Sequence, residues 1–317
     1  MAFIDKLLDL SVYLSFDQSG YHRHKRFVKD DFNKDIAQNL SSKHALVTGG
    51  TMGIGNACAD YLTSLKIPCT VTGRTPEKYI SRGADSLSRF VQLDLSDWDA
   101  IKKFVDSSES FHYLVLNAGG MPDSFVLNKY GIEHQMASQL FGHYFLMRYM
   151  VEQGKLVAGG RVVWVSSGGM YLAKLHLRDL FSFSGKQYDK VGTYANVKRA
   201  QVVLCQELTK DKKYSQFLIN AMHPGWVDTA GVRNAIPGFW KFTKNRLRTP
   251  AQGAETIIWL LLSNEVSTSG EFYFDWKKRP TYPFFWTKEK NLIRSEFISL
   301  LEDYYQKYFL KNIFIKE

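Results

Sequence analysis

A tyrosine and a lysine stand four positions apart in the stretch 193–198, Thr-Tyr-Ala-Asn-Val-Lys. On a helix this spacing places Tyr194 and Lys198 on one face. A free tyrosine has a pKa of about 10, and a nearby ammonium lowers that pKa because it stabilises the phenolate. The pair is therefore suited to general acid/base chemistry on an alcohol or a carbonyl. The same spacing also occurs by chance in exposed pairs, so its place in the fold decides between the two interpretations.

A glycine-rich turn earlier in the chain is suited to binding a phosphate. An apolar run at residues 44–47 precedes Gly49, Gly53 and Gly55, and apolar residues at helical spacing follow over 56–65. A strand, a glycine turn and a helix in this order let the backbone approach a pyrophosphate, with the first helical N–H groups pointing at the anion. A glycine-rich connection without a ligand is the alternative, and the rest of the chain must decide.

Short apolar strands and helices alternate from residue 43 onward. We expect strands at 44–47, 68–72, 90–93, 112–116, 161–165, 217–221 and 271–274, and helices at 56–65, 100–105, 124–151, 193–208 and 251–262. This alternation predicts an α/β fold with a doubly wound parallel sheet, whose ligands bind beyond the carboxyl ends of the strands. We expect a single domain at 43–276 with an insertion at 230–250, and extensions at 1–42 and 277–317.

The spacing Thr48-Gly49-x-x-x-Gly53-x-Gly55 resembles the glycine motif of the short-chain dehydrogenase/reductase family, and further motifs similar to that family's follow in order over residues 43–276. The resemblance implies a Rossmann fold and an enzyme that interconverts an alcohol and a carbonyl with a nicotinamide coenzyme. It also implies coenzyme contacts at a set of matched positions. These are Gly49, Thr51, Met52, Gly53, Ile54, Gly55, Asp94, Leu95, Asn117, Ala118, Gly119, Tyr194, Lys198, Pro224, Gly225, Val227 and Thr229.

The resemblance places two more residues beside Tyr194 and Lys198 in the catalytic group. Ser167, rather than Ser166, matches the family's serine that contacts the reacting oxygen. Its distance from Tyr194 along the chain exceeds the usual family spacing, so residues 170–191 must loop out, where we expect them to line a larger substrate site. Gln139 stands where many members have an asparagine that holds a water of a proton relay. The longer glutamine side chain has the same donor and acceptor groups.

Coenzyme choice can be predicted from the residues after the second strand. An enzyme that prefers NAD places a carboxylate there for the ribose 2′-hydroxyl, whereas this chain has Thr72-Gly73-Arg74. A guanidinium can bind a 2′-phosphate with two hydrogen bonds, and a carboxylate would repel it. We therefore expect NADP(H), with Arg74 as the phosphate ligand and NAD(H) as the alternative.

Composition limits the compartment and the partners. The 317 residues carry 41 basic and 31 acidic side chains, a net charge of +10, and three cysteines without paired or metal-like spacing. We expect buried thiols, no metal site and an intracellular protein, cytoplasmic or peripheral on a membrane, without a signal peptide or membrane span. Basic residues are scattered and no nucleic-acid module appears, so nucleic-acid binding ranks low.

The N-terminal extension has two interpretations. Ile4, Leu7 and Leu8 share one face of a predicted helix, and the basic run 22–26 follows it. Packing on the main domain is favoured over contact with anionic lipid. Sedimentation with anionic and with neutral vesicles would separate the two, since equal recovery in the supernatant would refute the lipid contact.

These observations favour an NADP(H)-dependent oxidoreductase. Aromatic residues in the insertion and in the C-terminal extension favour a small lipophilic substrate, and the sequence leaves room for a homo-oligomer. The alternative is a coenzyme-binding sensor or scaffold with weak turnover, to which the glutamine at position 139 points.

Overall fold

Eight strands form one sheet in the order β3-β2-β1-β4-β5-β6-β7-β8. The computed structural model describes residues 15–28, 40–79, 87–181, 188–282 and 285–311. The strands are β1 (Ala45–Thr48), β2 (Cys69–Gly73), β3 (Ser88–Gln92), β4 (Phe111–Leu116), β5 (Leu156–Val165), β6 (Leu218–His223), β7 (Phe272–Phe274) and β8 (Lys277–Lys278). All neighbours pair in parallel except β7 and β8, which are antiparallel.

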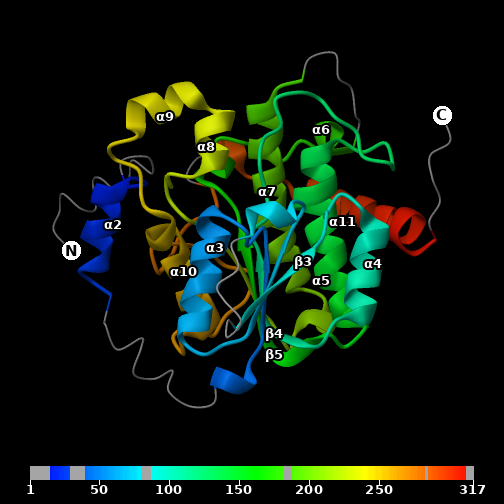
Figure 1. Ribbon diagram of the computed structural model, residues 1–317. Helices are drawn as coiled ribbons and strands as arrows, with labels where there is room; N and C mark the ends of the chain where they lie inside the picture. Colours follow the sequence, from blue (N-terminus) through cyan, green and yellow to red (C-terminus); the bar gives the residue numbers. More distant parts are fainter. Residues whose placement is uncertain (1–14, 29–39, 80–86, 182–187, 283–284, 312–317) are drawn as a thin grey trace.

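Helices cover both faces of this sheet (Figure 1). On one face, α3 (Gly53–Ser64) packs beside α10 (Pro250–Leu262). On the other lie α4 (Trp98–Ser107), α5 (His143–Glu152) and α7 (Lys190–Leu208). Parallel strands buried on both faces read as continuous apolar runs, which is why β1 and β4 could be placed from the sequence. The expected doubly wound α/β sheet is confirmed.

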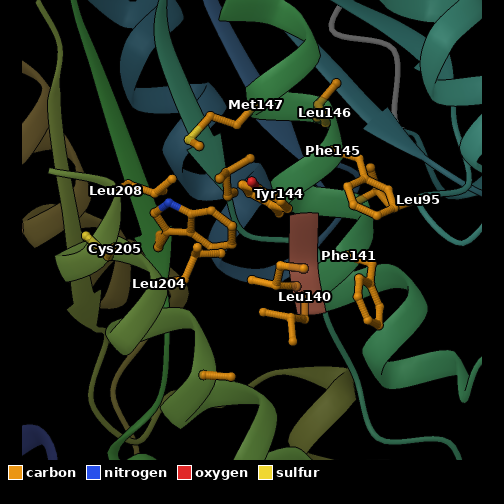
Figure 2. Close-up of a cluster of buried hydrophobic side chains, with 14 of the residues drawn as sticks. Leu95, Leu140, Phe141, Tyr144, Phe145, Leu146, Met147, Leu204, Cys205 and Leu208 are labelled. Atoms are coloured by element: carbon orange, nitrogen blue, oxygen red, sulfur yellow. The ribbon is translucent and has the colours of Figure 1, made fainter. Parts of the chain in front are cut away.

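The larger of the two clusters of buried apolar side chains lies between the sheet and the helices of the second face. Figure 2 shows side chains of Leu140, Tyr144 and Met147 gathered in one cluster with those of Leu204 and Leu208 from α7. The three cysteines are free and buried, as expected. Cys205 belongs to the cluster shown in Figure 2.

The helix expected over residues 124–151 begins about ten residues later, so that expectation was wrong at its start. Asn128 explains the difference, because its Oδ1 accepts the N–H groups of Tyr130 and Ile132 at 3.0 Å each and holds a turn. Such side-chain bonds compete with helix formation. The helix then opens with a wide turn, the π-helix η4 (Met136–Gly142), and continues as α5.

Shorter elements and the extensions complete the fold. They are α2 (Gln18–Lys25), η2 (Leu40–Ser42), η3 (Pro76–Lys78), η5 (Gly168–Tyr171), α6 (Leu177–Phe181), η6 (Lys212–Tyr214), α8 (Ala230–Ala235), α9 (Pro237–Thr243), η7 (Phe285–Thr287), α11 (Asn291–Tyr304) and η8 (Tyr305–Leu310). In the C-terminal extension α11 continues as η8, and Phe297 and Leu301 are the buried residues of α11. Ile4, Leu7 and Leu8 lie outside the described residues.

Candidate active site

The glycine turn between β1 and α3 forms a cradle that only small residues allow. Gly49 and Gly53 have φ of +64° and +58°, which favour glycine. A Cβ at Gly55 would lie 2.4 Å from the carbonyl oxygen of Gly49. The N-cap residue of α3, Met52, makes no side-chain hydrogen bond to the helix, so its first N–H groups are left for a ligand. Thr51 and Ile54 flank the cradle and are half-buried.

The segment after β4 is fastened to this turn. Thr48 Oγ1 accepts the N–H groups of Asn117 and Ala118, at 2.9 and 3.1 Å. In return, Asn117 Nδ2 donates to the carbonyl oxygens of Thr48 and Gly49, at 3.0 and 3.2 Å. Asn117 therefore fixes the shape of the turn, and the exposed Gly119 follows it at the edge of the cradle.

The loop after β6 lies against the same turn. Gly225 has a φ of +84°, and a Cβ there would meet Arg248. Thr229 caps α8 through an N–H···Oγ1 bond from Val232, and its methyl carbon lies 3.3 Å from the Cβ position of Gly53. The loop begins at Pro224, and the buried Val227 holds it to α10. Segments far apart in the sequence therefore form one continuous wall.

Arg74 and Asp94 follow β2 and β3, and their side chains have different partners. The exposed Arg74 lies with Nη1 3.1 Å from His134 Nε2, and its carbonyl oxygen accepts a bond from Gln92. Asp94 Oδ1 accepts the N–H of Ser96 at 2.8 Å, so this carboxylate stabilises its own turn. Leu95 belongs to the buried core.

Tyr194, Lys198 and Ser167 meet beyond the carboxyl end of β5. Lys198 Nζ lies 5.3 Å from the centre of the Tyr194 ring and donates to the carbonyl oxygen of Val165 at 3.0 Å. Tyr194 is half-buried, and the Ser167 hydroxyl lies near enough to it to affect its pKa, while Ser167 Oγ also accepts the N–H of Gly169 at 3.3 Å. Ser166 is buried and donates to the carbonyl oxygen of Lys198 at 2.9 Å, so its hydroxyl is already engaged.

The pKa shifts of this group differ from the sequence expectation. Burial raises the pKa of Tyr194, and the neighbouring Ser167 hydroxyl opposes that rise. Burial also lowers the pKa of Lys198 to about 7. The expectation that Lys198 brings the Tyr194 pKa below its ordinary value was therefore wrong, because desolvation disfavours both charged forms.

Gln139 sits on the π-helix with its side chain turned toward the segment after β4. Its Nε2 donates to the carbonyl oxygen of Gly120 at 2.6 Å. Its Oε1 is buried without a hydrogen-bond partner among the described residues, 2.8 Å from the Cβ position of Gly119. Lys198 Nζ lies 3.6 Å from that same position. An orphaned buried acceptor beside a buried ammonium is a group that a ligand or a water can satisfy.

Sequence reasoning missed two side chains that bind the Gln139 backbone. Gln201 Nε2 donates to the Gln139 carbonyl oxygen at 2.7 Å, and His143 Nδ1 lies 3.1 Å from the same oxygen. His143 Nε2 lies 2.9 Å from Thr48 Oγ1. Burial lowers the pKa of His143 to about 3, so the ring is neutral and its partners assign the proton to Nδ1. The spacing of four residues between Gln139 and His143 was the available signal.

His223 and two residues of the basic run 22–26 make structural contacts. His223 is buried and its Nδ1 accepts the N–H of Gly168 at 2.9 Å, so it is a packed, hydrogen-bonded histidine. In the basic run, His24 is buried with Nδ1 2.6 Å from Asp275 Oδ2, and Lys25 binds Glu255. The run as a whole therefore does not face outward. In the described ranges no three metal-binding side chains cluster, and no helix there has the length and apolarity of a membrane span.

The arrangement fits a nicotinamide dinucleotide. The uncapped N-terminus of α3 and its glycines can take the pyrophosphate, and Lys198 has ammonium protons beyond the one bound to Val165. A doubly wound sheet with this cradle and a Ser, Tyr and Lys group at its carboxyl edge defines a dinucleotide-dependent oxidoreductase.

Comparison with known proteins identifies the family. A family model described as short chain dehydrogenase matches residues 43–176. The chain is 34% identical over 279 residues to human dehydrogenase/reductase SDR family member 12, covering 84% of this chain and 86% of the relative. It is 28% identical over 253 residues to human retinol dehydrogenase 12, with 75% and 79% covered. The solved angucycline C-6 ketoreductase LanV with bound NADP shares the fold, with a TM-score of 0.60 and 21% identity over 75% of this chain and 95% of that one.

The chain belongs to the short-chain dehydrogenase/reductase family. It is an oxidoreductase that interconverts CH–OH and C=O groups with NAD(P).

Proposed function

We propose that this enzyme prefers NADP(H) and acts on a lipophilic carbonyl or alcohol. In the reducing direction Tyr194 donates a proton to the carbonyl oxygen, Ser167 stabilises the charge developing on that oxygen, and Lys198 supports the tyrosine. The nicotinamide coenzyme, when bound, supplies the hydride. The position of Lys198 Nζ 5.3 Å from the centre of the Tyr194 ring, with Ser167 near enough to Tyr194 to affect its pKa, is the observation that carries this proposal.

The protonation states support Tyr194 as the proton donor. Because burial raises its pKa above the ordinary value, the phenol is neutral at physiological pH. A neutral phenol can give a proton to a carbonyl oxygen but cannot accept one. The Ser167 hydroxyl opposes this rise in the Tyr194 pKa. The residue that contacts the substrate oxygen in this proposal therefore also affects the acidity of the proton donor. These features favour carbonyl reduction as the faster direction at neutral pH.

The coenzyme would be held by the cradle and the segments packed against it. Gly49 to Gly55 would hold the pyrophosphate. The wall formed by Asn117 to Gly119 and Pro224 to Thr229 would hold the nicotinamide half of the coenzyme, and Lys198 would bind the ribose of that half. Arg74 is the exposed cation at the end of β2, which supports a preference for the 2′-phosphate of NADP(H).

Apolar side chains beside the catalytic group support a lipophilic substrate. Leu172 follows the Ser167 turn and is 65% exposed, and Val191 opens the catalytic helix and is 49% exposed. The relative named retinol dehydrogenase 12 acts, by its name, on a lipophilic alcohol. We therefore assign residues 170–181, which include α6, and residues 188–191 to substrate binding.

A panel of carbonyls of increasing chain length tests this function. With NADPH we expect hexadecanal and all-trans-retinal to be reduced, with kcat/KM at least about tenfold above that for propanal, because each buried methylene contributes about 0.8 kcal/mol. NADPH consumption should match alcohol formation. If NADPH binds but no member of the panel is reduced, the alternative of a coenzyme-binding protein with weak turnover gains support.

Arg74 can be tested separately by binding alone. Arg74→Ala should weaken NADPH binding by about 10- to 100-fold, since it removes a charge-assisted pair worth about 1.5 to 3 kcal/mol. NADH, which lacks the 2′-phosphate, should bind as before. Lys78→Ala, which removes an exposed cation from the nearby η3, is the matched control. Equal losses for the two coenzymes in Arg74→Ala would refute the assignment.

A further inference from the structure

The described part of the N-terminal extension is built into the wall of the active site. Phe16 O accepts the N–H of Trp226 at 2.7 Å, and the N–H of Gln18 donates to Arg246 O at 2.8 Å. Arg248 Nη2 donates to the carbonyl oxygen of Ser15 at 2.9 Å. The segment 15–18 is therefore hydrogen-bonded at Trp226 to the loop after β6, which forms part of the proposed coenzyme wall, and also to Arg246 and Arg248, which follow α9.

A buried ion pair fixes this segment in place. Arg248 and Asp275 are both buried and face each other through two bonds, at 2.5 and 2.7 Å. Arg248 Nε also donates to Asp17 O at 3.1 Å, and His24 of α2 is the second partner of Asp275. Buried charges need such additional partners. The N-terminal segment supplies them, so its position is tightly specified.

Phe16 occupies the space behind the catalytic serine turn. Its side chain is 1% exposed. The centroid of its ring lies 4.3 Å from the ring centroid of His223 and 5.0 Å from that of Phe274, and both contacts are edge-on. A Cβ at Gly168 would lie 2.4 Å from Phe16 Cε2 and 2.9 Å from His223 Nε2. The Phe16 ring thus fills the volume that a side chain at position 168 would take.

These contacts join Phe16 to the reacting groups. Phe16 packs on His223, and His223 Nδ1 accepts the N–H of Gly168 at 2.9 Å. Gly168 follows Ser167 directly, and Ser167 lies near enough to Tyr194 to affect its pKa. A displaced imidazole would release the Gly168 N–H and let the serine turn move.

We propose that Phe16 is a positioning residue of this active site, which holds the Ser167–Gly168 turn in its catalytic geometry through His223. The catalytic part of this inference rests on the proposed function, whereas the mechanical coupling from Phe16 to Gly168 does not. The N-terminal extension is then a working part of the enzyme, and the serine turn depends on a residue about 150 positions away in the sequence.

Hydrogen exchange of the coenzyme-free protein tests the coupling without a substrate. In Phe16→Ala we expect the amide of Gly168 to exchange at least about tenfold faster, because its acceptor is no longer held. Phe16→Leu, which retains most of the volume, should restore most of the protection. Phe27→Ala removes a ring that is 49% exposed in the same segment and should change nothing at Gly168. Unchanged exchange in Phe16→Ala would overturn the proposal.

Catalysis supplies the second readout, with all-trans-retinal and NADPH as probes. We expect kcat of Phe16→Ala to fall by about 10- to 100-fold with a smaller change in KM, as for a misplaced catalytic group. If Phe16→Ala does not fold, Gly168→Ala probes the same contact from the other side. It should show the same loss of kcat, and full activity would overturn the proposal. Failure of the proposed function would look different, because no probe would be turned over while the exchange result still held.

Discussion

Lys198 is the residue of the proposed catalytic group whose pKa lies nearest to neutral pH. It is 2% exposed, and within the described residues its ammonium has one hydrogen-bond acceptor, the carbonyl oxygen of Val165. Burial therefore lowers its pKa to about 7, where a small change in pH alters its charge. The neighbouring Tyr194 is shifted the other way and stays protonated well above neutral pH. The lysine, rather than the tyrosine, is the group that titrates near neutrality.

This ordering predicts the pH dependence of carbonyl reduction. Below the Lys198 pKa the ammonium is charged and stabilises the phenolate that forms as Tyr194 gives up its proton. Above about pH 7 the lysine becomes neutral, so kcat for reduction should decline through that value. The measurement is kcat at saturating NADPH and retinal from acid to alkaline pH. Lys198→Met should be slow and lack this decline.

A wild-type profile that stays flat to about pH 9 would contradict the lowered pKa of Lys198.

Among the elements, α7 carries the proposed catalytic residues Tyr194 and Lys198 and also binds the C-terminal extension. Arg199, the residue after Lys198, is fully buried and binds Glu289, and it donates to the carbonyl oxygens of Thr281 and, at 3.2 Å, Thr287. Glu289 also accepts a bond from Arg294 of α11 at 3.1 Å. The C-terminal extension is therefore bound to α7 at Arg199, one residue after Lys198.

Removing one charge of this pair should destabilise the whole fold. Glu289→Gln leaves the Arg199 guanidinium buried without a full counter-charge, which we expect to cost about 3 kcal/mol of unfolding free energy. Urea unfolding measures this loss. Glu296→Gln, at an exposed position of α11, should stay within about 0.5 kcal/mol of the wild type. A loss no larger for Glu289→Gln than for this control would show that the pair contributes little.

At the scale of the whole molecule, the features that can be predicted from the sequence are those set by the local order and spacing of residues. Buried parallel strands are continuous apolar runs, and the turn around Gly49, Gly53 and Gly55 has a spacing dictated by backbone sterics. The sheet and the grouping of Tyr194 with Lys198 on one helix could therefore be predicted from the order and spacing of residues alone. The start of the helix near residue 134 could not, because a single turn residue, Asn128, outweighs helix propensity there.

Contacts between distant segments could not be predicted. Nothing local to Phe16 indicates that it packs behind Gly168, and nothing local to Arg199 indicates a partner ninety positions away. The expected pKa shift of Tyr194 was wrong for the same reason, because the sequence shows that Tyr194 and Lys198 are close but not that Lys198 is buried and Tyr194 half-buried. Burial is a property of the assembled molecule.

The central claim is that the Tyr194 phenol transfers the proton, and single-turnover reduction of all-trans-retinal by NADPH tests it most directly. Tyr194→Phe removes one oxygen atom, and Tyr149→Phe removes the same atom at a site where the hydroxyl binds Asp106, far along α5. We predict that the rate for Tyr194→Phe falls by about 100-fold or more, while its affinity for NADPH stays within about threefold and Tyr149→Phe behaves as the wild type. A Tyr194→Phe enzyme that reduces retinal at the wild-type rate would contradict the account.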